Sequence, residues 1–157
     1  MTPVGYVREL IPTYQDTTVH DTPSVISSAV LASIIRPLIG PGDLDEHAWA
    51  VYLNGNNRIL AVYKISEGGT TNTVMPPSKV LRGAILTNAA AFAVAHNHPS
   101  GEAHPSAADR RVTEDLVKAG HLLGIVCLDS LILGAKGHYS FADAGLIAEY
   151  RTAAERS

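Results

Sequence analysis

Two histidines, a serine and an aspartate lie close together in residues 95–109, which read AHNHPSGEAHPSAAD. His96 and His98 stand at the end of an expected strand, where alternate side chains project to the same side, so both imidazoles can converge on one point. Ser106 occupies an expected helix N-cap, and Asp109, three residues later, points back over the first helical turn. Two imidazoles and one carboxylate form a ligand set for Zn²⁺ that leaves the fourth tetrahedral position to water. The sequence therefore predicts one zinc ion, with a bound water, held by His96, His98 and Asp109.

Each of these residues also has an ordinary structural interpretation. Asp109 could be a helix-start carboxylate that interacts with the helix dipole, and Ser106 a simple N-cap. The joint pattern HxHx7Sx2D, however, is expected by chance in only about one such chain in a thousand. A zinc deaminase is excluded because its PCxxC half needs more cysteines than the single Cys127. The combined pattern therefore favours metal binding.

Helices and strands are expected to alternate along the chain and to position these residues. Strands are expected over residues 4–10, 47–53, 58–65, 89–95, 125–133 and 138–141, with an Asn-Gly turn joining the second and third in a hairpin. Helices are expected after an N-cap at Ser24, from Ser78 onward, and over residues 106–123 and 143–151. Pro37 and the Gly-Pro-Gly at residues 40–42 are expected to end the first helix, and residues 13–23 to form a loop. The order predicts an α/β or α+β fold with a mixed central sheet flanked by helices.

Composition narrows the class of protein. The chain has 157 residues, enough for one domain, and is 46% hydrophobic and 17% charged. Its net charge of −3 argues against capture of nucleic acid over the whole surface. One cysteine cannot close a disulfide within the chain, and the first residues lack the basic and apolar regions of a signal peptide. No run of 18 apolar residues is present, so we expect a cytoplasmic protein with no membrane partner.

The motif HxHx7Sx2D is the core of the JAMM (MPN+) metalloprotease motif, and the wider sequence resembles the RadC family of bacterial JAB-domain proteins. The resemblance runs from about Glu46 to Leu146. It is carried by AHNHPSG at 95–101, Pro105-Ser106, Asp109, Cys127-Leu128-Asp129, Leu131-Ile132 and Tyr139-Ser140-Phe141. It implies a cytidine-deaminase-like MPN/JAB fold over residues 41–157, preceded by an N-terminal arm and helix at residues 1–40.

The resemblance also implies an activity. JAMM proteins use a glutamate at the start of an early strand as general acid and base, and Glu46 occupies that place, with Glu67 and Glu102 as rivals. Ser106 would donate a hydrogen bond to the oxyanion. The expected protein is thus a zinc hydrolase that cleaves a peptide or isopeptide bond.

The chain departs from the family pattern in two places, and two alternative functions are weighed beside the hydrolase. Ser130 stands where RadC proteins often have a histidine, and the first forty residues cannot supply the helix-hairpin-helix region of longer members. One alternative is a non-catalytic MPN interaction module, although such members generally lose the metal ligands. Another is a DNA-associated accessory protein or nuclease, for which Arg110, Arg111 and Lys118 would form a thin phosphate-contacting stripe.

Overall fold

The computed structural model describes residues 5, 7–16, 24, 25, 27–40, 45–68 and 75–157. In this part of the chain a five-stranded sheet has the order β2-β1-β3-β4-β5, in which β3 and β4 are parallel and the other neighbours antiparallel. The elements are α1 (Ser28–Ile39), β1 (His47–Leu53), β2 (Ile59–Glu67), α2 (Pro77–Leu86), β3 (Ala91–Asn97), α3 (Ala107–Leu123), β4 (Val126–Leu133), β5 (His138–Ser140) and α4 (Leu146–Glu155). The predicted mixed α/β fold is confirmed.

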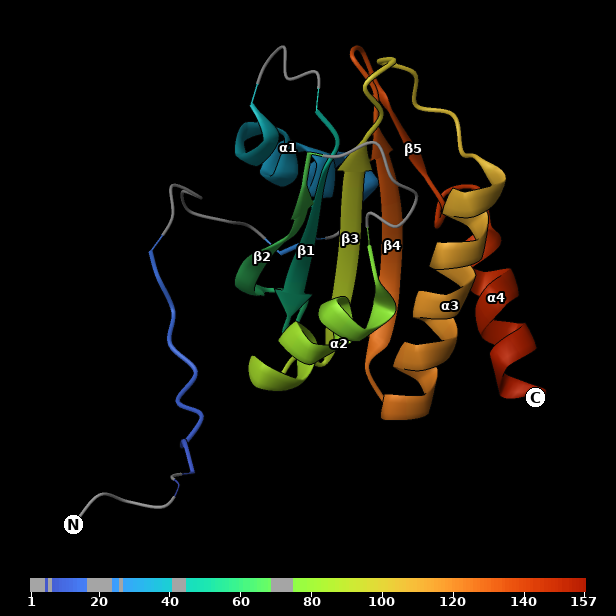
Figure 1. The fold of residues 1–157 in the computed structure, drawn as a ribbon. Helices are drawn as coiled ribbons and strands as arrows, with labels where there is room; N and C mark the ends of the chain where they lie inside the picture. The colour runs from blue at the N-terminus through green and yellow to red at the C-terminus, as the bar shows by residue number, and fades with distance from the viewer. Residues whose placement is uncertain (1–4, 6, 17–23, 26, 41–44, 69–74) are drawn as a thin grey trace.

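The sheet is covered by helices on both faces, with α2 in front of it and α1 behind it in Figure 1. Val51 and Leu53 of β1 pack in the cluster that contains Ile35 of α1. Ala50 and Tyr52 point to the opposite face, where they join the cluster formed with α2, α3 and α4. The alternation follows from the two-residue period of a strand, and it makes β1 and β3 fully covered central strands.

The N-terminal part differs from the sequence prediction in three ways. The helix is capped by Ser27, whose Oγ accepts the Val30 N–H, and not by Ser24. Val25 is held outside the helix because its N–H donates to the Asn57 carbonyl in the hairpin turn. Pro37 lies inside the last turn of α1 and does not end it, since only one hydrogen bond is lost there.

The strand predicted over residues 4–10 is wrong for residues 5 and 7–10, which form no strand; residues 4 and 6 lie outside the described residues. Val7 is 98% exposed, so in this arm it has no apolar surface to cover it. Residues 13–16 lack helix and strand, as predicted for a loop, whereas 17–23, 41 and 42 lie outside the described part.

The last helix begins three residues later than predicted because a buried carboxylate organises the preceding turn. Asp129 Oδ1 accepts the N–H groups of Ser130 (2.7 Å) and Ala142 (3.0 Å), and its Oδ2 accepts the Ser140 hydroxyl (2.7 Å). Burial raises the pKa of Asp129, and these hydrogen bonds oppose the rise. Asp129 thereby ties β4 and β5 to the turn that leads into α4.

Ser130, at the place of the family histidine, is fully buried and accepts the Thr113 hydroxyl of α3 at 3.0 Å. Thr113 lies one helical turn after Asp109, on the same side of α3. Ser130 therefore anchors the helix that carries Asp109.

Gly83 provides a test of how tightly α2 packs on the sheet. A Cβ at this position would lie 2.1 Å from the Tyr52 hydroxyl, which donates to the Val80 carbonyl at 2.7 Å. We expect Gly83→Ala to lower the free energy of unfolding by about 2 kcal/mol or more, because the ring must shift and its hydrogen bond weakens. Urea unfolding followed by circular dichroism measures this. Gly55→Ala, where a Cβ meets nothing within 4 Å, is the control; equal unfolding midpoints for the two variants would contradict the packing.

Candidate metal centre

The candidate centre lies where the end of β3, the start of β1 and the start of α3 meet. β1 and β3 are antiparallel, and Ala48 is paired with His96, which places Glu46, just before β1, beside the end of β3. The loop at 98–106 then returns to α3, whose first turn carries Asp109. Three segments that are separate in the sequence thus supply polar side chains to one end of the sheet.

The three predicted ligands are in mutual contact. The two Nε2 atoms of His96 and His98 are 3.3 Å apart. Asp109 Oδ1 is 3.1 Å from the Nε2 of His96, and Asp109 Oδ2 is 3.1 Å from the Nε2 of His98. Zinc–ligand bonds of about 2.0–2.1 Å in a tetrahedral site separate neighbouring ligand atoms by about 3.3 Å. The two ring nitrogens are therefore about as far from each other, and each about as far from one carboxylate oxygen, as two ligand atoms of one small cation would be.

The orientation of His98 strengthens this fit. Its Nδ1 lies 3.1 Å from the Glu102 carbonyl, which can only accept, and the neutral ring that donates to this carbonyl has a lone pair on Nε2. That lone pair faces a carboxylate oxygen at 3.1 Å, a contact between two acceptors. A cation between them, or a second proton on the ring, removes the repulsion. The donor set therefore fits a metal ion, and the carbonyl contact is the kind that orients metal-bound histidines.

Glu46 lies beside the two histidines. One carboxylate oxygen of Glu46 and one ring nitrogen each of His96 and His98 all lie within 4.8 Å of one another, so these residues also form a possible metal-binding group. His96 is 1% exposed, whereas Glu46 is half-buried, so the group is closed off from solvent at His96 and accessible at Glu46. Glu46 is thus within reach both as a ligand and as a base next to one.

Asp109 is held in place by the start of α3. Its N–H donates to Ser106 Oγ (3.1 Å), and its Oδ2 accepts the Ser106 N–H (2.8 Å), which forms the predicted capping box. Burial by itself would raise the pKa of Asp109, but the hydrogen bond and charge of His96 and the bonds from Ser106 outweigh it and lower the pKa below its usual range. Asp109 is therefore ionised, as a metal ligand must be.

Asn97, the spacer within the histidine pair, makes contacts next to Glu46 that the sequence pattern alone did not reveal. It is buried on the other face of β3, where its Oδ1 accepts the His47 N–H (2.6 Å) and its Nδ2 donates to the Asp45 carbonyl (2.9 Å). These two bonds bracket Glu46 in the backbone of the opposing strand. The sequence did contain a signal for these contacts. Asn97 is a polar residue in an otherwise apolar strand, and a buried amide must find hydrogen-bond partners.

The other two carboxylates considered as bases lie differently. Glu67 ends β2, where its Oε2 pairs with Lys64 Nζ at 3.1 Å and its Oε1 is 3.9 Å from His47 Nδ1. Glu102 contributes its backbone carbonyl to His98, and its side chain is exposed. Of the three glutamates considered as the base, Glu46 is the one that the structure places beside both histidines.

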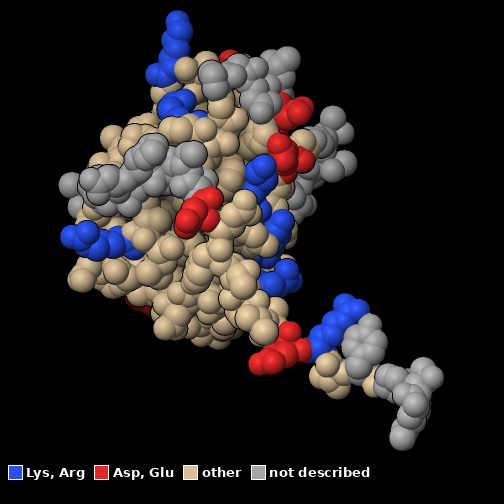
Figure 2. Space-filling model, turned by 90° about the vertical axis from the view of Figure 1, so that its left-hand side faces the viewer, with Lys and Arg blue, Asp and Glu red and all other residues tan. Residues whose placement is uncertain are grey.

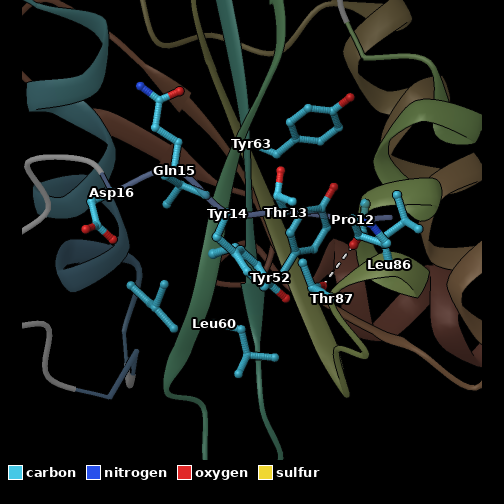
Figure 3. Close-up of a pocket in the computed structure, with 14 residues that line it drawn as sticks. Pro12, Thr13, Tyr14, Gln15, Asp16, Tyr52, Leu60, Tyr63, Leu86 and Thr87 are labelled. Atoms are coloured by element: carbon cyan, nitrogen blue, oxygen red, sulfur yellow. Dashed lines mark hydrogen bonds between the residues drawn. The ribbon is translucent and has the colours of Figure 1, made fainter. Parts of the chain in front are cut away.

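A cavity of about 570 Å³ lies away from these residues, between the N-terminal arm and β2. Figure 3 shows Tyr52, Tyr63 and Thr87 around it, with Thr13 and Tyr14 of the arm beside them. Its lining includes none of the predicted ligands or bases.

Comparison with known proteins gives a family match and a set of relatives. The family model described as the RadC-like JAB domain matches residues 25–146. A UPF0758 protein of Flavobacterium johnsoniae is 34% identical over 122 residues, which cover 78% of this chain and 53% of that protein. A UPF0758 protein of Salinibacter ruber is 41% identical over 124 residues, covering 78% and 52% of the two chains. The chain spans about half the length of these relatives.

The matched range begins earlier than the resemblance seen in the sequence and includes α1, so it crosses the domain boundary predicted between residues 40 and 41, which stays a prediction. No helix in the described ranges is both long and apolar enough to cross a membrane. With a mixed sheet between helices and a Glu-His-His group at the end of its central strands, this chain belongs to the RadC-like JAB domain family.

Proposed function

We propose that this protein is a zinc-dependent hydrolase that cleaves amide bonds of the peptide or isopeptide type. In the proposal His96, His98 and Asp109 hold the zinc ion, and Glu46 is the general acid and base. The observation that carries it is the contact of three side chains, in which the two ring nitrogens are 3.3 Å apart and each lies 3.1 Å from one oxygen of Asp109, with the Glu46 carboxylate beside the two rings. Three ligands without a fourth from the protein are typical of catalytic zinc.

Bound zinc would supply Lewis-acid chemistry and lower the pKa of water to about 7. Glu46 would accept the proton of the attacking water and pass it to the leaving amine, as general acid–base catalysis requires. The Ser106 oxygen accepts the Asp109 N–H, so the hydroxyl hydrogen remains available to donate. Donated to the carbonyl oxygen as it gains charge, such a bond contributes about 3 kcal/mol to the transition state.

The two alternatives have less support. Non-catalytic members of the superfamily generally lose the metal ligands, whereas His96, His98 and Asp109 are all present and in contact here. For DNA binding, Lys118 of the basic stripe is paired with Glu114 at 3.1 Å. On the face shown in Figure 2, Lys and Arg lie among Asp, Glu and uncharged residues. A cytoplasmic location and a peptide partner stay predictions.

Zinc removal tests the proposal. We expect the purified protein to hold close to one zinc ion per chain and to hydrolyse a fluorogenic lysine-isopeptide or linear peptide substrate. Chelation should abolish hydrolysis, and one equivalent of Zn²⁺ should restore it, because the ion activates the water. Hydrolysis that persists after complete zinc removal, or a protein that binds no zinc, would refute the proposal. Nicking of supercoiled plasmid without peptide hydrolysis would instead indicate a nuclease.

A further inference from the structure

Arg36 of α1 makes two hydrogen bonds to a distant turn. Its Nη1 donates to the Gly134 carbonyl at 2.9 Å and its Nη2 to the Gly137 carbonyl at 2.7 Å. Gly134 and Gly137 begin and end the turn between β4 and β5, which is closed by the Gly134 N–H donating to the Gly137 carbonyl at 2.8 Å. The planar guanidinium thus holds both ends of the turn at once, a geometry that the lysine ammonium cannot reproduce.

The far side of this turn lies against the loop that carries His98. The Ala135 N–H donates to the Gly101 carbonyl at 2.8 Å. A Cβ on Gly134 would lie 2.9 Å from the same carbonyl oxygen and 3.0 Å from the Cβ of Ala103. The turn at 134–137 and the loop at 101–103 are therefore packed directly against each other, so a displacement of the turn must move the loop.

Gly101 and Ala103 flank Glu102, whose carbonyl lies 3.1 Å from the Nδ1 of His98. The loop is also closed by the Gly101 N–H, which donates to the His98 carbonyl at 2.9 Å. The Glu102 carbonyl at this position favours the tautomer of His98 with its proton on Nδ1, in which Nε2 presents a lone pair.

From these contacts we propose that Arg36 is a positioning residue for His98. It acts through the turn at 134–137 and the loop at 101–103, although α1 packs on the face of the sheet opposite α2 and α3. The inference rests on the proposed function in so far as His98 is a zinc ligand. It makes α1 part of the support of the metal centre.

The competing explanation is that Arg36 only attaches α1 to the rest of the fold. A variant of Ser28 distinguishes this explanation from a role in positioning His98. Ser28 Oγ donates to Asp143 Oδ2 at 2.5 Å and lies 3.1 Å from His138 Nε2, so it too ties α1 to the C-terminal half of the chain. Its partners belong to β5 and the turn before α4, not to the turn at 134–137. Ser28→Ala is therefore the matched control for Arg36→Ala.

The experiment compares both variants with the unchanged chain in zinc-free form, at a pH where the rings are neutral. Long-range ¹H–¹⁵N spectra report which ring nitrogen of His98 is protonated. We expect the Nδ1–H form in the unchanged chain and in Ser28→Ala, and a mixture of both forms in Arg36→Ala. Zinc affinity, measured by competition with a chelator, should fall about 10- to 100-fold in Arg36→Ala only. Arg36→Lys, which retains fewer donors, should recover part of the loss.

Unchanged His98 spectra together with unchanged zinc affinity in Arg36→Ala would overturn the inference, as would equal effects of Ser28→Ala. If Arg36→Ala does not fold, Gly134→Ala displaces the same loop from the turn, and the same His98 shift is expected. Failure of the unchanged chain to bind zinc would refute the proposed function, whereas the zinc-free spectra would still decide the role of Arg36.

Discussion

Glu46→Gln is expected to lower the rate of amide hydrolysis about 10²- to 10⁴-fold while the zinc content stays the same. Glutamine keeps the size of the side chain but cannot accept the proton of water, and Glu46 lies beside both histidines, just before the start of β1. Turnover on the substrate that the zinc-loaded protein cleaves, together with metal analysis of the same sample, measures both quantities.

Glu67→Gln is the matched control, because Glu67 is a carboxylate at the same end of the sheet that pairs with Lys64. We expect it to leave turnover within a factor of about two, since an exposed ion pair contributes little. A large loss in Glu67→Gln with an active Glu46→Gln would move the base to Glu67. Loss of zinc from Glu46→Gln would make Glu46 a ligand.

Asp109→Asn is expected to weaken zinc binding about 100-fold or more, because it removes the only negative charge among the three proposed ligands. Asparagine can still accept the Ser106 N–H, so the capping box and α3 should survive. With His98→Ala in the same chain, the zinc content should fall close to zero. Chelator competition and metal analysis measure these changes, and circular dichroism checks the helix.

Asp115→Asn on the same helix is the control for the charge change, since Asp115 is exposed and lies beyond the capped turn. Its zinc affinity should equal that of the unchanged chain. If the double variant Asp109→Asn, His98→Ala still held one zinc ion, the ligand assignment would be wrong.

The elements predicted best from the sequence are those whose ends are determined by a few neighbouring residues. The capping pair Ser106 and Asp109 defines the start of α3, and Gly124, with φ of 72°, its end. The first helix was predicted with the wrong cap because serines at 24 and 27 are equally suitable locally. The choice depends on the bond from Val25 to Asn57, which is a contact of the folded hairpin.

In the candidate site, too, residues that are close in the sequence were predicted better than residues brought together by folding. His96, His98 and Asp109 lie within one strand, loop and helix, so their spacing alone suggested convergence, and the structure brings them together. Glu46 reaches the group only through the pairing of β1 with β3, which is why the sequence left it beside rivals. Asn97 and Arg36 were missed because their partners lie about 50 and 100 residues away in the chain.

The pairing of Ala48 with His96 also has a thermodynamic consequence. An unfolded chain does not hold Glu46, the histidine pair and Asp109 together, so an ion that needs this arrangement binds the native state selectively. Such selective binding shifts the folding equilibrium, by about 2.7 kcal/mol when free ion is at 100 times its dissociation constant. The amount of native protein in a cell would then follow the availability of the metal.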